Sequence, residues 1–365
     1  KEYRRQRQMC IRDRFGGGFF PATNVIDYVT IDTTGNATDF GDLTVARYQL
    51  SACASSTRGV FGGGYDTAAS NVIDYVTIAS IGNATDFGDL TVARYGLAAC
   101  SNAAAAVQAT PTSSAMAFFF GGLSGAPFAT IQSAVTYVNI ATTGNAMLFG
   151  DITNSDLKYG GDALASSTRL VLGGSYLSIV YWEVATGGNQ TTFGNLNVSL
   201  DNNGSSACSN STRGIWSGGS GAGGTILNNI QYITIATTGN ALDFGDLLNT
   251  TNVSCSCAST TRGIISGGTT TLSANSAINV IQYVTIASTG NATDFGDLLT
   301  ALGRSVSCSS STRGLIAGGQ STSSVATNVI QYITIASTGN STDFGDLVVA
   351  DKNFCSASSE TRGLF

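Results

Sequence analysis

Short runs of apolar residues alternate with polar turns along the whole chain. In one copy of the pattern, a run of small residues spans Leu50–Ser56 and a hydrophobic run that ends in paired glycines spans Gly59–Gly63. A run rich in β-branched and aromatic residues follows at Val72–Ile78, and a last run spans Thr85–Thr91. Turn residues separate such runs every ~8–12 residues, which is typical of antiparallel strands. No segment keeps an apolar period of about 3.6 residues, so we predict no substantial helix.

This four-strand pattern recurs along the chain with a period near fifty residues. A Gly-Asn turn between the third and fourth strands marks every copy. Its glycine stands at Gly35, Gly82, Gly144, Gly188, Gly239, Gly290 and Gly339. Four strands per unit at this period are typical of a β-propeller, in which radial repetition leaves only short sheet edges. Residues shared by all copies are expected to be scaffold, and those that differ are where a ligand could be recognised.

We therefore predict an all-β fold, a seven-bladed β-propeller with four-stranded antiparallel blades, over residues 15–365. The C-terminal residues 354–359 have the pattern of a first strand, and residues 361–365 begin a second strand. The N-terminal residues 14–18 have the pattern of a second strand without a first. One blade should thus be shared between the two chain ends. A segment cut from a longer array is the alternative, because the two second-strand segments overlap.

Residues 1–14 form a basic head that matches no copy of the repeat, and we expect an artefact or a tag there. The head holds six of the seventeen basic residues, so the rest of the chain has a net charge of −10. An acidic body argues against binding to nucleic acid. No stretch approaches the ~18 apolar residues of a transmembrane helix, so no membrane insertion is expected.

Several repeated positions resemble the kelch repeat, and they are expected to be structural. In this sequence they include Gly62, Gly63, Tyr75 and Phe87. The repeated Asp86, Asp89, Arg58 and Arg313 are expected to be structural as well. Phe87 stands where kelch repeats usually have Trp, while Arg47, Arg94 and Arg304 match the kelch Arg. The near-identical copies are also similar to repeat proteins of marine phages that are virion or tail components. These resemblances imply a propeller and an extracellular or virion localisation, but a fold defines no activity.

Histidine is absent from the chain, which excludes Ser-His-Asp and Cys-His nucleophilic sites and nearly all zinc or copper catalysis. Asp-Phe-Gly occurs in five copies without the other kinase elements. Its carboxylates are expected to accept backbone N–H bonds at the turns, with calcium binding by pairs such as Asp39 and Asp42 as the alternative. Unrepeated carboxylates show no spacing that selects a glycosidase pair. We expect no catalytic residue, no metal and no cofactor.

Cysteine, arginine and asparagine recur at fixed places in the repeat, each with two interpretations. One cysteine per copy on the first strand favours a small buried side chain over a disulfide or metal site. The Thr-Arg-Gly arginines could form a ring that binds acidic groups, but we favour neutralisation of an Asp in a neighbouring turn. The Asn-x-Ser/Thr sites are interpreted as turns that need Asn for a left-handed backbone, not as glycan acceptors.

The connections that follow the paired glycines differ from copy to copy. They contain small polar residues with an occasional aromatic, a composition typical of loops that bind ligands. We therefore place the candidate ligand-binding residues there. These residues are Phe19, Phe20, Tyr65, Asp66, Phe128 and Tyr176. We predict a non-enzymatic binding or structural module that presents these loops to a cell-surface glycan or protein, other virion proteins included. The alternatives are a carbohydrate-active hydrolase or lyase on the same fold, and a structural decoration without a ligand.

Overall fold

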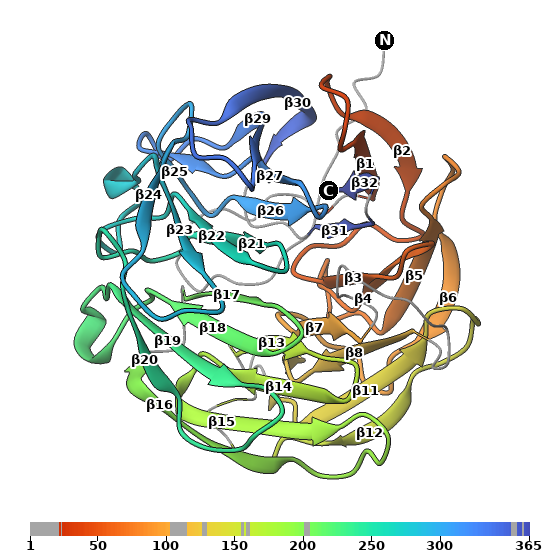
Figure 1. Ribbon diagram of the computed structural model, residues 1–365. Coiled ribbons are helices and arrows are strands. Elements are labelled where there is room, and N and C mark those ends of the chain that lie inside the picture. The colour runs from red at the N-terminus through yellow and green to blue at the C-terminus, as the bar shows by residue number, and fades with distance from the viewer. Residues whose placement is uncertain are drawn as a thin grey trace.

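The computed structural model describes residues 22, 24–102, 115–125, 130–154, 157, 161–200, 205–351, 356–359 and 361–365. Seven four-stranded antiparallel sheets stand around a common axis (Figure 1), which confirms the predicted seven-bladed propeller. In the described residues, helical structure is confined to short 3₁₀ turns such as η2 (Ala222–Gly224) and η3 (Ala274–Ser276). The predicted lack of substantial helix is therefore confirmed for this part of the chain.

Each blade is a meander of four strands that follow one another from the axis outwards. Blade 1 consists of β3 (Ser51–Ala54), β4 (Arg58–Gly62), β5 (Val72–Thr77) and β6 (Thr85–Asp89). Blade 2 consists of β7 (Ala98–Ser101), β8 (Met116–Phe120), β11 (Ala134–Asn139) and β12 (Met147–Asp151). Blade 3 consists of β13 (Asp162–Ala165), β14 (Arg169–Gly173), β15 (Tyr176–Glu183) and β16 (Thr191–Leu200). Blade 4 consists of β17 (Ser206–Ser209), β18 (Arg213–Ser217), β19 (Asn229–Thr234) and β20 (Leu242–Asp246).

The remaining blades follow the same order. Blade 5 consists of β21 (Cys255–Ala258), β22 (Arg262–Ser266), β23 (Val280–Thr285) and β24 (Thr293–Asp297). Blade 6 consists of β26 (Val306–Ser309), β27 (Arg313–Ala317), β29 (Thr327–Thr334) and β30 (Thr342–Asp351). Blade 7 consists of β31 (Ala357–Ser358), β32 (Arg362–Leu364), β1 (Val25–Thr30) and β2 (Thr38–Asp42). Two small sheets lie outside the blades, β9 (Leu123–Ser124) with β10 (Thr130–Ile131) and β25 (Leu302–Gly303) with β28 (Gln320–Ser321).

Blade 7 closes the ring, because its strands come from both ends of the chain. The C-terminal β32 pairs with the N-terminal β1, with Leu364 opposite Tyr28 and Arg362 opposite Thr30. The second strand of this blade is therefore C-terminal, and the predicted N-terminal copy at residues 14–18 lies outside the described residues. The expectation of a blade shared between the termini is confirmed.

The first strands form an inner ring in which each small strand neighbours the next, from β3 through β7, β13, β17, β21 and β26 to β31. Serine hydroxyls link these strands: Ser256 Oγ donates to the carbonyl of Ala207 at 2.8 Å, and Ser307 Oγ donates to that of Ser256 at 2.9 Å. The cysteines of this ring point between blades. Burial raises the pKa of the Cys208 thiol to about 12, so the cysteine acts as a small apolar side chain, as the sequence predicted.

The glycine of Thr-Arg-Gly makes room for the cysteine of the preceding blade. A Cβ atom at Gly263 would lie 2.9 Å from the Sγ atom of Cys208. The same contact recurs between Cys257 and Gly314 and between Cys308 and Gly363. The close approach of neighbouring blades therefore depends on a residue without a side chain at this point.

The Gly-Asn turn of each blade docks on the outer strand of the preceding blade. Gly82 N–H donates to the Phe40 carbonyl at 2.8 Å, and Ala84 N–H donates to the Asp42 carbonyl at 2.7 Å. The Asn83 side-chain oxygen accepts the N–H of Asp42 at 3.1 Å. The turn glycine also faces the glycine of the Phe-Gly pair in the outer strand of the preceding blade. This pairing occurs at Gly41–Gly82, Gly88–Gly144, Gly150–Gly188, Gly194–Gly239, Gly245–Gly290, Gly296–Gly339 and Gly345–Gly35.

The predicted reason for the turn asparagine is wrong. In the described part of the chain, none of the turn asparagines has a positive φ angle. The side-chain carbonyl is what the turn uses, because it accepts an N–H from the neighbouring blade. The residues that do so are Asn36, Asn83, Asn145, Asn240, Asn291 and Asn340.

The residues expected to be structural lie within the blades and between them. Tyr75 packs edge-to-face on Phe87, with ring centroids 5.7 Å apart, and every other blade has an equivalent pair. The exposed Asp86 accepts the N–H of Gly88, as predicted for these carboxylates, and the Asp89 N–H donates to Asn145. A Cβ at Gly62 would strike the ring of Phe119, and Gly63 has a φ of 70°.

Each third strand except those of blades 2 and 3 carries a buried Asp or Gln directly before its tyrosine, a feature that sequence reasoning missed. Its side-chain oxygen accepts the N–H of the linker that arrives from the preceding blade. The pairs are Asp74 with Thr44, Gln231 with Asn197, Gln282 with Leu248, Gln331 with Leu299 and Asp27 with Val348. This bond fixes the point at which the chain passes from one blade to the next.

The two carboxylates of this set, Asp74 and Asp27, differ in their electrostatic surroundings. Asp74 forms a buried ion pair with Arg47 at 2.9 Å. Asp27 has no cationic partner among the described residues, and its Oδ1 atom has no hydrogen-bond partner. Burial raises the pKa of Asp27 to about 7, with a further contribution from the nearby Asp39 carboxylate, although the Val348 N–H opposes the shift.

The Cys208–Gly263 contact predicts a coupled pair of substitutions. Gly263→Ala should lower the free energy of unfolding by about 1–2 kcal/mol, because the new Cβ overpacks the interface between blades 4 and 5. In a Cys208→Ala background the same change should be nearly neutral, since the Sγ atom is gone. Chemical denaturation of the four proteins of this double-mutant cycle measures the coupling. Equal losses in both backgrounds would contradict the contact.

Asp27 predicts a pH dependence of stability. Its folded-state pKa of about 7 lies above the unfolded value of 3.8, so the folded protein keeps a proton that the unfolded chain loses between these pH values. The free energy of unfolding should therefore fall as the pH rises from about 4 to about 7. Asp27→Asn mimics the protonated carboxyl and should remove this part of the fall. Denaturant unfolding across this pH range measures it, and an unchanged slope in the variant would contradict the assignment.

Candidate functional site

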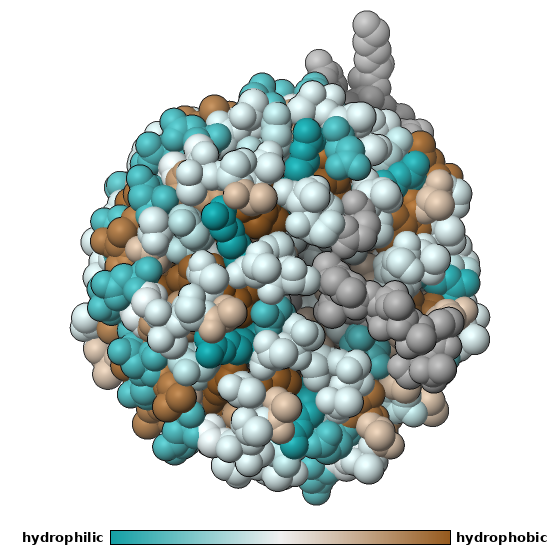
Figure 2. All heavy atoms as spheres, viewed as in Figure 1, coloured by the Kyte–Doolittle hydropathy of each residue, from teal (hydrophilic) through white to brown (hydrophobic). Residues whose placement is uncertain are grey.

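The two faces of the ring differ in what they carry. In each meander, the connections between first and second strands and between third and fourth strands lie at one end, which we call the turn face. The connections between second and third strands, and the linkers between blades, lie at the other end, which we call the loop face. On the face of the ring seen in Figure 2, hydrophobic side chains form small separate patches among polar ones.

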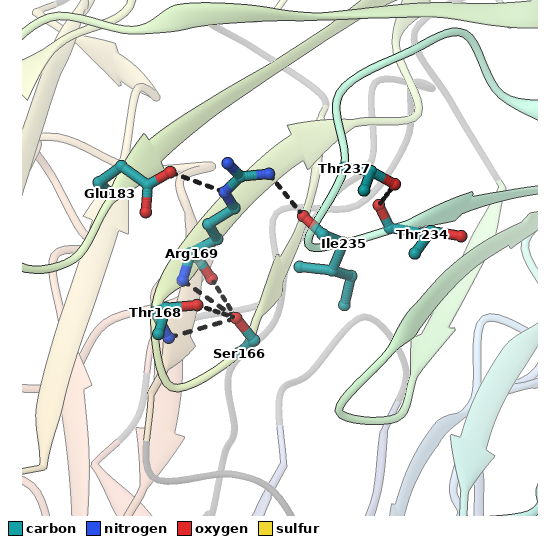
Figure 3. Close-up of polar contacts among 7 residues, drawn as sticks. All are labelled: Ser166, Thr168, Arg169, Glu183, Thr234, Ile235 and Thr237. Atoms are coloured by element: carbon teal, nitrogen blue, oxygen red, sulfur yellow. Dashed lines mark hydrogen bonds and ion pairs between the residues drawn. The ribbon is translucent and has the colours of Figure 1, made fainter.

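Six arginines bind the next blade at the turn face, five in a Thr-Arg-Gly turn and Arg169 at the same position in Thr168-Arg169-Leu170. In Figure 3, Arg169 donates to the Ile235 carbonyl at 3.0 Å and to the Glu183 carboxylate at 2.7 Å. Five equivalents also donate to a carbonyl of the next blade: Arg58 to Ile140, Arg213 to Ile286, Arg262 to Ile335, Arg313 to Ile31 and Arg362 to Ile78. Each guanidinium also lies over the third-strand tyrosine of its own blade, as Arg313 does over Tyr332 at 4.5 Å.

The prediction that these arginines neutralise an Asp in a neighbouring turn is therefore wrong. Among the described residues, the only one of the six that forms an ion pair is Arg169, and its partner is a glutamate of the same blade. The guanidinium groups are engaged by carbonyl oxygens and aromatic rings. A structural role for Arg58 and Arg313 agrees with this arrangement.

Two buried arginines anchor the linkers at the loop face. Arg47 precedes Tyr48 and pairs with Asp74, and both of these charged side chains are fully buried. Arg94 precedes Tyr95 and donates to the carbonyls of Phe119, Gly121 and Ala134 and to the hydroxyl of Thr136. Burial lowers the pKa of Arg94 to about 10, because no carboxylate among the described residues pairs with it. These bonds fix the backbone on which Tyr48 and Tyr95 stand.

The assignment of Arg304 to the same repeated position is wrong. The Leu302 carbonyl accepts the Gly268 N–H in the way that the Arg94 carbonyl accepts the Gly64 N–H. Leu302 therefore takes the place of Arg94, and Arg304 lies two residues further on with a φ of 59°.

The variable loops share a common base, on which tips of different length stand. In blade 1, Tyr65 pairs by backbone with Tyr48 of the incoming linker and with Ala69 of the returning loop. In blade 5, Thr269 pairs in the same way with Asn252 and Ala277. Residue type at the base thus varies between blades while the backbone arrangement is kept.

Three tyrosines meet at the loop face of blade 1. The rings of Tyr48 and Tyr65 have centroids 5.6 Å apart at an interplanar angle of 62°. The rings of Tyr65 and Tyr95 are 4.9 Å apart at 69°. All three side chains are partly exposed. We call Tyr48, Tyr65 and Tyr95 the tyrosine cluster.

The exposed Asp66 gives the tyrosine cluster an acidic neighbour. Burial raises the pKa of Tyr48, and the nearby Tyr65, Tyr95 and Asp66 groups add to the shift. The Tyr48 phenol is therefore neutral at physiological pH and can donate a hydrogen bond. Among the described residues, the phenol oxygens of Tyr48 and Tyr65 have no hydrogen-bond partner.

Of the predicted ligand-binding residues, the structure brings Tyr65 and Asp66 to this cluster. Tyr176 takes the same repeat position in blade 3, where it begins β15 with a φ of 53°. Phe19, Phe20 and Phe128 lie outside the described residues. Sequence reasoning missed Tyr48 and Tyr95. Their signal is the departure from the repeat, since the equivalent residues in later linkers are Asn252 and Gly303.

The described residues contain no group of three or more His, Cys, Asp or Glu side chains placed to hold a metal ion. No helix among them is long and apolar enough to span a membrane.

The chain matches no protein-family model, and no curated protein matches it in sequence. Among solved structures, it is similar to one described as "Structure of YjhT", with a TM-score of 0.60 and 10% sequence identity. The similarity covers 83% of this chain and 98% of that chain. At this identity it supports the propeller fold alone.

Proposed function

We propose that the protein is a non-enzymatic binding module whose loop face holds a cell-surface glycan or protein. The kelch-like repeat pattern and a virion-associated or extracellular location belong to the same proposal. The stiff ring is the scaffold, and recognition lies in the loops that differ between blades.

The observation that carries this proposal is the tyrosine cluster, placed on the face where the repeat varies. The turn face is occupied by contacts between blades, since the arginines and the Gly-Asn turns bind the neighbouring blade. The loop face places partly exposed rings beside an exposed carboxylate. Tyrosines held on a rigid base supply contact area at a low entropic cost, which suits binding.

A pair of variants tests the proposal with the full chain. The loop-face variant replaces residues 66–68, the tip of the blade 1 loop, with Gly-Ser-Gly. The turn-face control is Ile81→Ser, at a side chain that is 57% exposed. Both should keep the unfolding temperature of the natural chain. Binding is measured on intact bacterial cells, on a glycan array and on an array of cell-surface proteins.

The loop-face variant should lose at least about tenfold in affinity for the target found, or ~1.4 kcal/mol, and the control should lose none. Loss in the turn-face variant alone would contradict the proposal. A natural chain that binds none of these surfaces would contradict it as well.

A further inference from the structure

We propose that the tyrosine cluster is a carbohydrate subsite that takes a neutral pyranose ring, with Asp66 accepting hydrogen bonds from its hydroxyl groups. This inference rests on the proposed function and adds the chemical class of the ligand and the residues that hold it.

The ring geometry is the first argument. Tyr65 lies between Tyr48 and Tyr95, and neither neighbour is parallel to it, with angles of 62° and 69°. The cluster therefore presents ring faces and ring edges in more than one direction. An aromatic face carries negative partial charge and attracts the C–H groups that line one face of a pyranose.

The polar groups around the rings are the second argument. A pyranose has an apolar face and a rim of hydroxyl groups, so its site needs both aromatic area and polar partners. The phenol oxygens of Tyr48 and Tyr65 have no partner among the described residues, and Asp66 is exposed beside them. Each of these oxygens can bind a sugar hydroxyl.

Charge selects a neutral sugar over an anionic one. Asp66 is the charged group that faces Tyr48, and Arg47 and Arg94 are buried and held by oxygen atoms of blades 1 and 2. Outside the basic head the chain has a net charge of −10. Among the described residues, a sulfated or carboxylated sugar at this position would meet a carboxylate and no accessible cation beside it.

The size of the cluster favours a sugar over a protein. A stable protein interface buries roughly 800 Å² on each partner. A whole tyrosine buries about 150–250 Å², and these three are already partly buried, so the cluster alone falls well short of that area. One sugar ring matches its size.

The cluster is also preorganised. Tyr48 and Tyr65 exchange both backbone hydrogen bonds, at 2.8 and 2.7 Å, and the Gly96 N–H donates to the Gln49 carbonyl at 2.9 Å, which joins the two linkers. The buried side chains of Arg47 and Arg94 anchor these linkers to blades 1 and 2. A ligand therefore binds rings that are already fixed, which lowers the entropic cost of binding.

Blade 5 supplies a matched control, because its loop base has the same backbone pairing with Asn252 and Thr269 in place of Tyr48 and Tyr65. The double variant Tyr48→Asn/Tyr65→Thr thus installs residues that this fold already accepts at these positions. Tyr65→Phe keeps the ring and removes one hydroxyl, and Asp66→Asn removes the charge.

The experiment uses the full chain, with maltotriose, cellotriose and chitotriose as neutral probes and polygalacturonate and heparin as anionic probes. Affinity is measured by calorimetry and contact by saturation-transfer NMR. At least one neutral trisaccharide should bind. The double variant should weaken it at least tenfold with an unchanged unfolding temperature, and Tyr65→Phe should weaken it less than the double variant.

Several results would overturn the inference. One is a double variant that binds neutral sugars as the natural chain does. A second is a preference for the anionic probes that Asp66→Asn strengthens. A third is binding to a cell-surface protein, with no sugar bound, that the double variant removes. In each case the proposed binding function stands and only the ligand class or the residues are wrong. A chain that binds neither sugars nor cell surfaces would contradict both this inference and the proposed binding function.

Discussion

Each blade is held to the one before it by a Gly-Asn turn that lies against the outer strand of that preceding blade. The two chain segments meet glycine to glycine, and a Cβ atom on the outer-strand Phe-Gly glycine would strike the backbone of the facing turn. The turn also covers the outermost strand of the preceding blade, which would otherwise leave an unpaired sheet edge exposed. The contact is present at every interface, including the one between Gly345 and Gly35, where the chain ends meet.

This contact explains why the two faces of the ring have different tasks. Turns that must dock on a neighbour keep glycine and asparagine, and the Thr-Arg-Gly arginines add a bond to the next blade on the same face. The loop face is held at its linkers by buried groups such as Arg47 and Asp74. The side chains at the loop bases take no part in this anchoring, because the bases pair through their backbones, so Tyr65 in one blade can be Thr269 in another.

The sequence was sufficient for the architecture because each copy restates the same strand pattern. It was insufficient for contacts between copies. Asn83 is a turn residue by type, yet its role depends on a partner N–H in another blade, forty-one residues away. The tyrosine cluster could not be predicted for the same reason. Tyr48 and Tyr95 lie in two different linkers and meet Tyr65 only when adjacent blades pack. Comparing unlike residues at equivalent positions would have found them.

Hydrogen exchange at the seven turn glycines measures whether every Gly-Asn turn is docked on the preceding blade. These amides sit in surface turns, where exchange is normally fast, yet each donates to a carbonyl of the preceding blade. We expect strong and similar protection at all of them, the Gly35 amide at the chain closure included. Fast exchange at Gly35 and Ala37 alongside protected amides elsewhere would show an open ring and contradict this expectation.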